Sequence, residues 1–298
     1  MECSRGIRSA LSLLLTCGVG ISVCGGFSQA RSLDEIKQSG EVRVCLVPVP
    51  EGFTVEPSEC RENCKFGGDL YDLAIAFSQS LGRDIKPKIV RVEWDEQFFN
   101  QDGRTVQEDT YTPALLASGK CDAYQTGLTK LPWREKKLGF VTLYPTRMVV
   151  MVNKSRQQQL KTPADLCGKA AATVKNTSYH MWMQAQNDST CVSNPIKIEF
   201  MNFEETSKAL DSERVDFKMD NFDNTLWLGT PFKNSVAGFA VGPVVEQGLA
   251  FRKEDKDLQA AARKFLDTQK ASKDSLWNKQ WKSGIGMTLP EYLERVPK

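Results

Sequence analysis

The chain has 298 residues, with 39 Lys and Arg against 37 Asp and Glu and a formal net charge of +2. A charge this balanced provides no attraction toward nucleic acid, so we expect no nucleic-acid partner. There is one His and no Cys-x-x-Cys pair, which argues against a metal site, and no sequence feature indicates a cofactor.

Residues 1–30 are predicted to be a secretory signal peptide. Two arginines precede an apolar stretch over residues 10–23, and Ser28-Gln29-Ala30 places small residues where a signal peptidase reads them. Cleavage after residue 30 is expected, with lipidation as the alternative. The remaining residues, 31–298, contain no apolar run of membrane-spanning length, so an exported, periplasmic protein is predicted.

Six cysteines remain after the signal peptide, an even number that suits an oxidising compartment. We favour a Cys167–Cys191 disulfide because these two residues bracket one candidate helical segment. The other four, Cys45, Cys60, Cys64 and Cys121, are expected to pair locally or between strands.

The first half of the chain alternates predicted strands and helices. Helices are predicted over 32–40, 68–81 and 112–118, with strands over 41–47, 89–94 and 122–125 and a loop over 48–67. In the second of these helices the apolar residues recur at helical spacing, which indicates a face buried in the core. The alternation is typical of a doubly wound α/β fold.

A polar cluster follows the strand predicted over 122–125. Thr126, Gly127 and Thr129 are small or hydroxylated and come at its carboxyl end, where ligands of open α/β sheets usually bind. Arg134 comes five residues later, and its planar guanidinium suits two-point binding of a carboxylate. The cluster indicates an anion receptor, and a surface arginine after a turn is the alternative.

This stretch resembles the signature of the family-3 periplasmic solute-binding proteins, the amino-acid type. Residues 67–77 are similar to that family's Gly-hydrophobic-Asp-hydrophobic helix, and residues 165–169 to its Asp-Leu-x-Gly-Lys turn. The resemblance implies a two-lobed type II periplasmic-binding fold with a central ligand cleft and two hinge strands. It divides the chain into lobe 1, residues 31–146 plus 243–298, and lobe 2, residues 147–242.

The same resemblance implies a ligand site. Thr126, Gly127, Thr129 and Arg134 would hold the α-carboxylate of the ligand. Phe53, in the loop after the first strand, is the candidate aromatic wall. The segment around Trp94 and Tyr111 is expected to set side-chain selectivity.

The predicted second lobe contributes from the opposite wall. Residues 140–144 and 147–153 are strongly apolar, with a buried strand predicted over 148–152. Further strands are predicted over 170–174, 196–201 and 215–219, with a helix over 203–211. Thr177 and Ser178 begin another helix, where hydroxyls and free N–H groups form a seat for a carboxylate. An ordinary helix cap is the alternative interpretation.

One position departs from the family pattern. Family members usually place a carboxylate five residues after an Asp equivalent to Asp216, where this chain has Asn221; Asp220 comes one residue earlier. We favour Asp220 as the partner of the ligand's ammonium group, with Asn221 or no partner as alternatives. Alternation places Lys218 on the same strand face, which suggests a more acidic ligand, or a surface ion pair.

The sequence therefore predicts a monomeric, non-enzymatic binding protein that captures a small carboxylated solute, an amino acid or related compound, for the permease of an ABC importer. An exported enzyme on the same scaffold, similar to cyclohexadienyl dehydratase, is one alternative. A sensor that presents its closed form to a receptor is another. The resembled family requires no cofactor.

Overall fold

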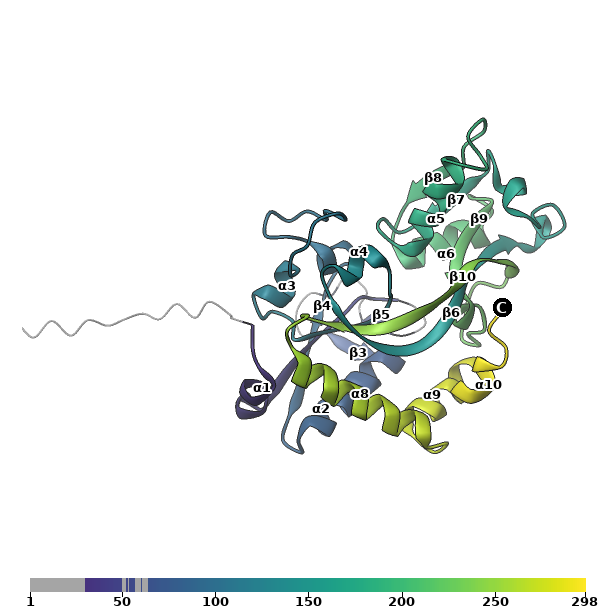
Figure 1. Ribbon diagram of the computed structural model, residues 1–298. Helices are drawn as coiled ribbons and strands as arrows, with labels where there is room; N and C mark the ends of the chain where they lie inside the picture. The colour runs from purple at the N-terminus through teal and green to yellow at the C-terminus, as the bar shows by residue number, and fades with distance from the viewer. Residues whose placement is uncertain (1–29, 50–51, 53, 57–59, 61–63) are drawn as a thin grey trace, which may run out of the picture.

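The computed structural model describes residues 30–49, 52, 54–56, 60 and 64–298. It has the predicted two-lobed α/β fold, with two long strands that run from one lobe into the other (Figure 1). Residues 1–29 of the predicted signal segment, and Phe53, fall outside the described residues. Within the described part, no helix combines the length and apolarity needed to cross a bilayer.

Ten strands are described. They are β1 (Glu41–Leu46), β2 (Thr54–Glu56), β3 (Lys65–Gly67), β4 (Lys86–Arg91), β5 (Ala123–Thr129), β6 (Gly139–Asn153), β7 (Ala170–Thr173), β8 (Lys197–Phe200), β9 (Phe217–Asn221) and β10 (Ser235–Phe251). Eight of them form one sheet in the order β4-β1-β5-β10-β6-β9-β7-β8, and β2 pairs with β3.

The helices cover the two halves of this sheet. They are α1 (Leu33–Ser39), α2 (Asp69–Leu81), α3 (Ala114–Ala117), α4 (Pro132–Glu135), α5 (Ser178–Asn187), α6 (Phe203–Asp211), α7 (Phe222–Thr225), α8 (Lys256–Ala271), α9 (Leu276–Ile285) and α10 (Leu289–Leu293). Short 3-10 helices cover Asp95–Phe98, Lys154–Arg156 and Pro163–Leu166.

We call the part built on β4, β1 and β5, with α1–α4 and α8–α10, the first lobe. The part built on β9, β7 and β8, with α5–α7, is the second lobe (Figure 1). The residue bounds given above for the lobes remain a prediction. The first predicted boundary falls inside β6 and the second inside β10.

The two connecting strands are continuous. β6 pairs with β10 in antiparallel register from Gly139 opposite Phe251 to Asn153 opposite Ser235. The strand predicted over 148–152 and the apolar runs over 140–144 and 147–153 are therefore all part of β6. Pro145 does not interrupt β6 because its other edge is unpaired there, since pairing with β9 begins only at Met148.

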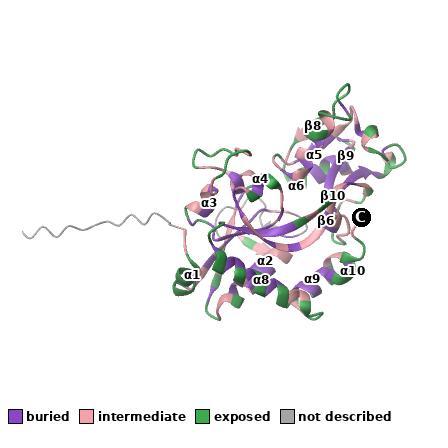
Figure 2. Cartoon of the chain, viewed as in Figure 1, coloured by how far each residue is buried: buried purple, intermediate pink, exposed green. Residues whose placement is uncertain are grey.

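Each lobe has its own apolar core. Buried residues follow the strands and the inner helix faces, while the outer faces are exposed (Figure 2). The first-lobe core includes Val44, Phe77, Phe251 and Trp277, and the second-lobe core includes Val150, Leu166, Met183 and Phe217. Two separate cores joined by a strand pair permit each lobe to move as a unit.

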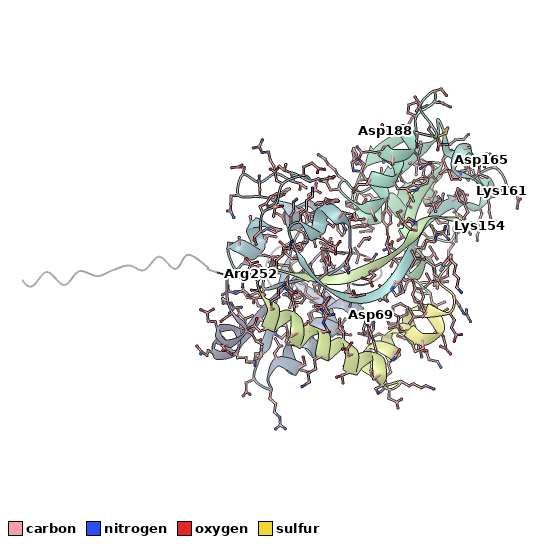
Figure 3. The ribbon with its side chains drawn as sticks, in the orientation of Figure 1. Asp69, Lys154, Lys161, Asp165, Asp188 and Arg252 are labelled. Carbon is pink, nitrogen blue, oxygen red and sulfur yellow. A yellow bond between two sulfur atoms is a disulfide. The ribbon has the colours of Figure 1, made fainter. Side chains whose placement is uncertain are left out.

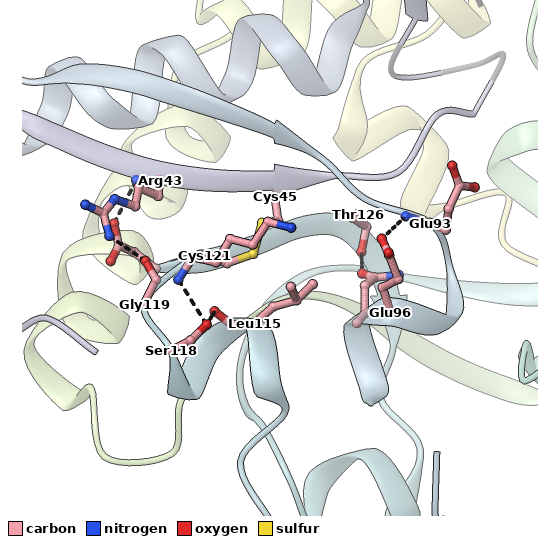
Figure 4. Close-up of a disulfide and its surroundings, with 12 residues drawn as sticks. Arg43, Cys45, Glu93, Glu96, Leu115, Ser118, Gly119, Cys121 and Thr126 are labelled. Atoms are coloured by element: carbon pink, nitrogen blue, oxygen red, sulfur yellow. Dashed lines mark hydrogen bonds between the residues drawn. A yellow bond between two sulfur atoms is a disulfide. The ribbon is translucent and has the colours of Figure 1, made fainter. Parts of the chain in front are cut away.

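Three disulfides occur among the described residues. The favoured Cys167–Cys191 bridge forms, Cys60–Cys64 closes a local ring, and Cys45–Cys121 joins β1 to the chain just before β5. The last bridge lies in the first lobe, near Gly119 and Thr126 (Figure 4).

Several predicted strand bounds differ from the structure. β4 ends at Arg91 and not at Trp94, because the chain turns there into the 3-10 helix that starts at Asp95. β9 starts and ends two residues later than predicted, since its pairing with β6 runs from Phe217 to Asn221. β10 runs without a break from Ser235 to Phe251.

Candidate functional site

A cavity of about 180 Å³ lies where the two lobes meet. Its wall includes residues of β5, α2 and α9 from the first lobe, β6 and β10 between the lobes, and α5, α6, β9 and α7 from the second lobe. Seven of the nine residues proposed from the sequence line it: Trp94, Thr126, Gly127, Thr129, Thr177, Ser178 and Asp220.

The sequence placed the hydroxylated cluster after a strand ending at residue 125. In the structure the cluster lies within β5, because pairing with β10 continues as far as Thr129. A bulge interrupts this pairing, since Leu128 lies opposite Gly248 and Tyr124 opposite Ala250. Gly127 lies inside the bulge with φ +61°, a backbone conformation that glycine adopts without strain. The bulge therefore places the backbone of Gly127 and the side chain of Thr126 on the cavity wall.

Both threonine hydroxyls are held by glutamines. Thr126 donates to Gln97 Oε1 at 2.6 Å, and Gln247 Nε2 donates to the Thr129 hydroxyl at 3.0 Å. Gln247 is 1 % exposed, and its Oε1 atom has no hydrogen-bond partner. This residue, which lines the cavity, was not proposed from the sequence.

Arg134 lies next to the cavity but does not line it. It is fully buried, with its guanidinium 4.9 Å from the ring centre of Phe98, 5.2 Å from Trp133 and 5.4 Å from Trp94. Nη1 donates to the carbonyl of Thr129, and Nε has no partner. No carboxylate among the described residues pairs with it, which leaves a buried cation without a counter-ion.

Burial lowers the pKa of Arg134 to about 9, because the apolar surroundings disfavour its charged form. Its second contact crosses between the lobes: Nη2 donates to the carbonyl of Asn176 at 3.0 Å. Asn176 has φ +58°, and its side chain donates to Asp95 of the first lobe at 3.0 Å. The segment before α5 thus reaches the first lobe through two hydrogen bonds.

Helix α5 begins at the cavity. Thr177 is its N-cap and accepts from the N–H of His180, so this hydroxyl does cap the helix as the alternative interpretation held. Ser178 is the first helical residue, where N–H groups have no carbonyl partner within the helix. The helix start therefore presents donors to the cavity that both residues line.

Asp220 lines the cavity but already has partners. Lys218 pairs with it at 2.9 Å, and its Oδ1 accepts from Asn224 and from the N–H of Asn221. Lys218 therefore forms an ion pair, as the alternative interpretation held, but the pair is buried and does not lie on the surface. Because Asp220 neutralises Lys218, the lysine adds no net positive charge to the cavity.

Asn221 has the opposite character. It is 8 % exposed, it lines the cavity, and its Oδ1 atom has no hydrogen-bond partner. Strand alternation would place neighbouring residues on opposite faces, but both Asp220 and Asn221 reach the cavity because β9 ends here and α7 begins.

Two further carboxyl groups line the cavity that the sequence did not single out, Asp69 and Asp223. Asp223 accepts hydrogen bonds from Thr146 at 2.6 Å and from Tyr144 at 3.0 Å. Burial is the main cause that raises its pKa to about 6. Burial also raises the pKa of Asp69, with the neighbouring Asp72 adding to the effect.

The raised pKa of Asp223 predicts a pH-dependent stability. A carboxyl group with a higher pKa in the folded state stabilises the fold at low pH, and this contribution is lost as pH rises from 3.8 to about 6. We expect Asp223→Asn to gain stability relative to the native protein over this interval, by up to about 3 kcal/mol. Urea unfolding at pH 4 to 7 measures the difference. A difference that does not change with pH would contradict the assignment, and Asp274→Asn on the surface is the control.

The cavity wall does not include Glu199, Glu204, Glu205 or the single histidine, His180. Glu199 forms an exposed ion pair with Arg214, and Glu204 forms one with Lys208. Glu205 caps α6, and His180 accepts from the N–H of Asn176. Within the described residues, no group of three or more His, Cys, Asp or Glu side chains is arranged to hold a metal ion.

Similar folds occur among solved structures. ArgBP from T. maritima, in a mutant form, superimposes with a TM-score of 0.66 and 25 % identity, covering 85 % of this chain and 100 % of that one. An ancestral amino-acid-binding protein, a precursor of cyclohexadienyl dehydratase, gives 0.67 and 22 %, over 85 % and 99 % of the two chains.

A third similar structure is AbpA from Streptococcus pneumoniae bound to L-arginine, with a TM-score of 0.64 and 19 % identity, over 85 % of this chain and 99 % of that one. A comparison with curated proteins gave no match. The model of the bacterial extracellular solute-binding proteins, family 3, matches residues 53–281. The match covers most of the chain, which therefore belongs to that family of solute-binding proteins.

Proposed function

We propose that this protein captures a small carboxylated solute outside the cytoplasm, an amino acid or a related compound, and delivers it to the permease of an ABC importer. The observation that carries the proposal is Arg134, a buried cation without a carboxylate partner among the described residues, beside an interlobe cavity. A buried charge is costly unless it is paired, so this position is suited to a ligand that brings the counter-ion. The similar structures named for arginine binding agree with such a ligand.

Capture would couple ligand binding to lobe closure. The ligand's carboxylate would bind between Thr129 of the first lobe and Ser178 at the start of α5 in the second, with Arg134 exchanging the Asn176 carbonyl for a carboxylate oxygen. The closed form then gains contacts that the open form lacks, and the ligand shifts the population by that difference. The continuous β6 and β10 strands would serve as the hinge.

A thermal-shift screen of amino acids and small carboxylates tests the proposal. A ligand at 100 times its dissociation constant adds about 2.7 kcal/mol to stability and should raise Tm by about 5 °C or more. Amines and sugars without a carboxylate should give no shift. The absence of any shift with carboxylated solutes at millimolar concentration, measured on the mature chain, would reject the proposed function.

An exported dehydratase is the second candidate, and Asp223 is the observation that favours it. Burial raises the pKa of this cavity carboxyl to about 6, which suits a general acid. Both its oxygens already accept from Tyr144 and Thr146, which argues against proton transfer by this group. Turnover of prephenate-like substrates by the native protein, lost in Asp223→Asn, would favour the enzyme, and no turnover would exclude it.

A further inference from the structure

The register of three strands shows how the cavity floor is oriented. Thr129 of β5 lies opposite Gln247 of β10, which in turn lies opposite Tyr144 of β6. Directly opposed residues project to the same face of a sheet, and all three side chains line the cavity. Two strand spacings separate Thr129 from Tyr144, roughly 10 Å. The cavity floor therefore runs from the Arg134 side to a distal end at Tyr144.

The hydrogen-bonding groups without a partner change from donors to acceptors along this floor. At the Arg134 side they are donors: Nε of Arg134 and Nε1 of Trp94 have no partners. Further along they are acceptors, the Oε1 of Gln247 and the Oδ1 of Asn221, and both residues are more than nine-tenths buried. Leaving a buried acceptor without a donor is costly, so a ligand that donates hydrogen bonds fits here.

The distal end is acidic. Asp223 is hydrogen-bonded to Tyr144, and the carboxylate of Asp69 lies 3.4 Å from the position a Cβ would take on Gly284 of α9. In the part of the chain that the structure describes, no Lys or Arg forms an ion pair with either carboxyl group. Figure 3 labels Asp69 between the long strands and the C-terminal helices. Lys218 offers no compensation, because Asp220 already pairs with it.

Aromatic rings surround the same end. The ring of Trp281 lies 4.8 Å from that of Tyr144, at an interplanar angle of 84°, and Trp277 lies 6.3 Å from Tyr144. Trp227 of the second lobe also lines the cavity, and the N–H of Leu228 next to it donates to the carbonyl of Gly284. Aromatic faces and carboxylates together favour a cation, through the ring quadrupole and direct charge attraction.

We propose that the distal end is a cation subsite, formed by Asp69, Asp223 and these aromatic rings, and that the ligand is a basic amino acid or a similar solute with a second cation. The proposal rests on the proposed function and specifies its ligand. The carboxylate binds on the Arg134 side, the α-ammonium donates to Gln247 Oε1 and Asn221 Oδ1, and the side-chain cation reaches Asp69. An extended basic amino acid matches the length of the floor. This replaces the acidic ligand expected from Lys218.

Titration calorimetry with matched ligands tests the subsite. We expect L-arginine or L-lysine to bind at least tenfold more tightly than its neutral counterpart, L-citrulline or L-norleucine, and L-glutamate to bind most weakly. Neutral or acidic amino acids that bind as tightly as basic ones would overturn the subsite while leaving the proposed function intact. If no carboxylated solute binds at all, both proposals fail.

Charge-neutral variants localise the effect. Asp69→Asn should lower the affinity for the basic ligand about tenfold and leave that for its neutral counterpart within twofold. Asp274→Asn removes the same charge from an exposed residue outside the cavity and should leave both affinities unchanged. Asp223→Asn, a second variant, carries the same expectation as Asp69→Asn. A preference for basic ligands that survives both cavity variants would overturn the subsite.

Discussion

Replacement of Arg134 by Met is expected to lower ligand affinity by about 3 kcal/mol or more, on the order of 100-fold. The guanidinium is buried among Trp94, Phe98 and Trp133, where a carboxylate would bind it with little competition from water. Titration calorimetry on the native protein and the variant, with the ligand that the thermal-shift screen identifies, measures the loss.

The same variant separates a ligand-binding role from a structural one. Since Arg134 is buried without a carboxylate partner in the described residues, its removal relieves a desolvated charge, and its loss should change the unliganded Tm by only a few degrees. Lys137→Met is the matched control: Lys137 is equally buried and also donates to backbone carbonyls, but those of Gln107 and Asp109 belong to the first lobe, whereas Arg134 reaches Asn176 of the second.

The Lys137 variant should lose stability and keep its ligand affinity. The Arg134 variant should keep most of its stability and lose ligand affinity. Arg134→Lys retains the charge and loses the planar fork of donors, so an intermediate affinity is expected. An Arg134→Met variant that binds its ligand as tightly as the native protein would show that the carboxylate binds elsewhere in the cavity.

The local part of the site could be predicted from the sequence. Thr126, Gly127, Thr129 and Arg134 fall within nine residues, so one strand and one turn bring them together whatever the rest of the chain does. The strand bounds were less predictable, because pairing with β10 decides where β5 ends. Local patterns carry no information on a partner strand more than 100 residues away.

The distal end depends on contacts between distant elements. Asp69 opens α2, Trp281 lies on α9, and they meet only because the C-terminal helices return to the first lobe and pack against Tyr144. On its own helix Trp281 has the spacing of a core residue, and it is in fact 9 % exposed. The sequence pattern of Trp281 therefore indicates only a core residue, whereas its position in the fold also makes it part of the cavity wall.

At Asn221 a single departure from the family pattern alters the expected chemistry of the site. The sequence alone left Asp220 and Asn221 as alternatives for contacting an ammonium group. In the structure Asp220 is bound by Lys218 and Asn224, so the open acceptor is the neutral amide of Asn221, with Gln247 across the cavity. Which of two neighbouring residues is free depends on their side-chain partners, and these come from other elements of the fold.

Loss of the Cys45–Cys121 disulfide is expected to lower the free energy of unfolding by about 4 kcal/mol. The bridge closes a loop of 76 residues, which restricts the unfolded chain strongly. In the double variant Cys45→Ala, Cys121→Ala, urea unfolding should shift to lower midpoints, and the ligand affinity of the folded protein should persist, since neither cysteine lines the cavity.

The three bridges offer an internal comparison, because loop closure predicts an order. The 24-residue loop of Cys167–Cys191 should cost about 3 kcal/mol when its bridge is removed, and the four-residue ring of Cys60–Cys64 about 2 kcal/mol. Cys45–Cys121 also ties β1 to the chain just before β5, the strand that carries Thr126 and Thr129. If the double variant lost ligand affinity as well as stability, the bridge would be needed to position β5. Equal losses of unfolding free energy for all three bridges would rule out loop closure as the dominant cause.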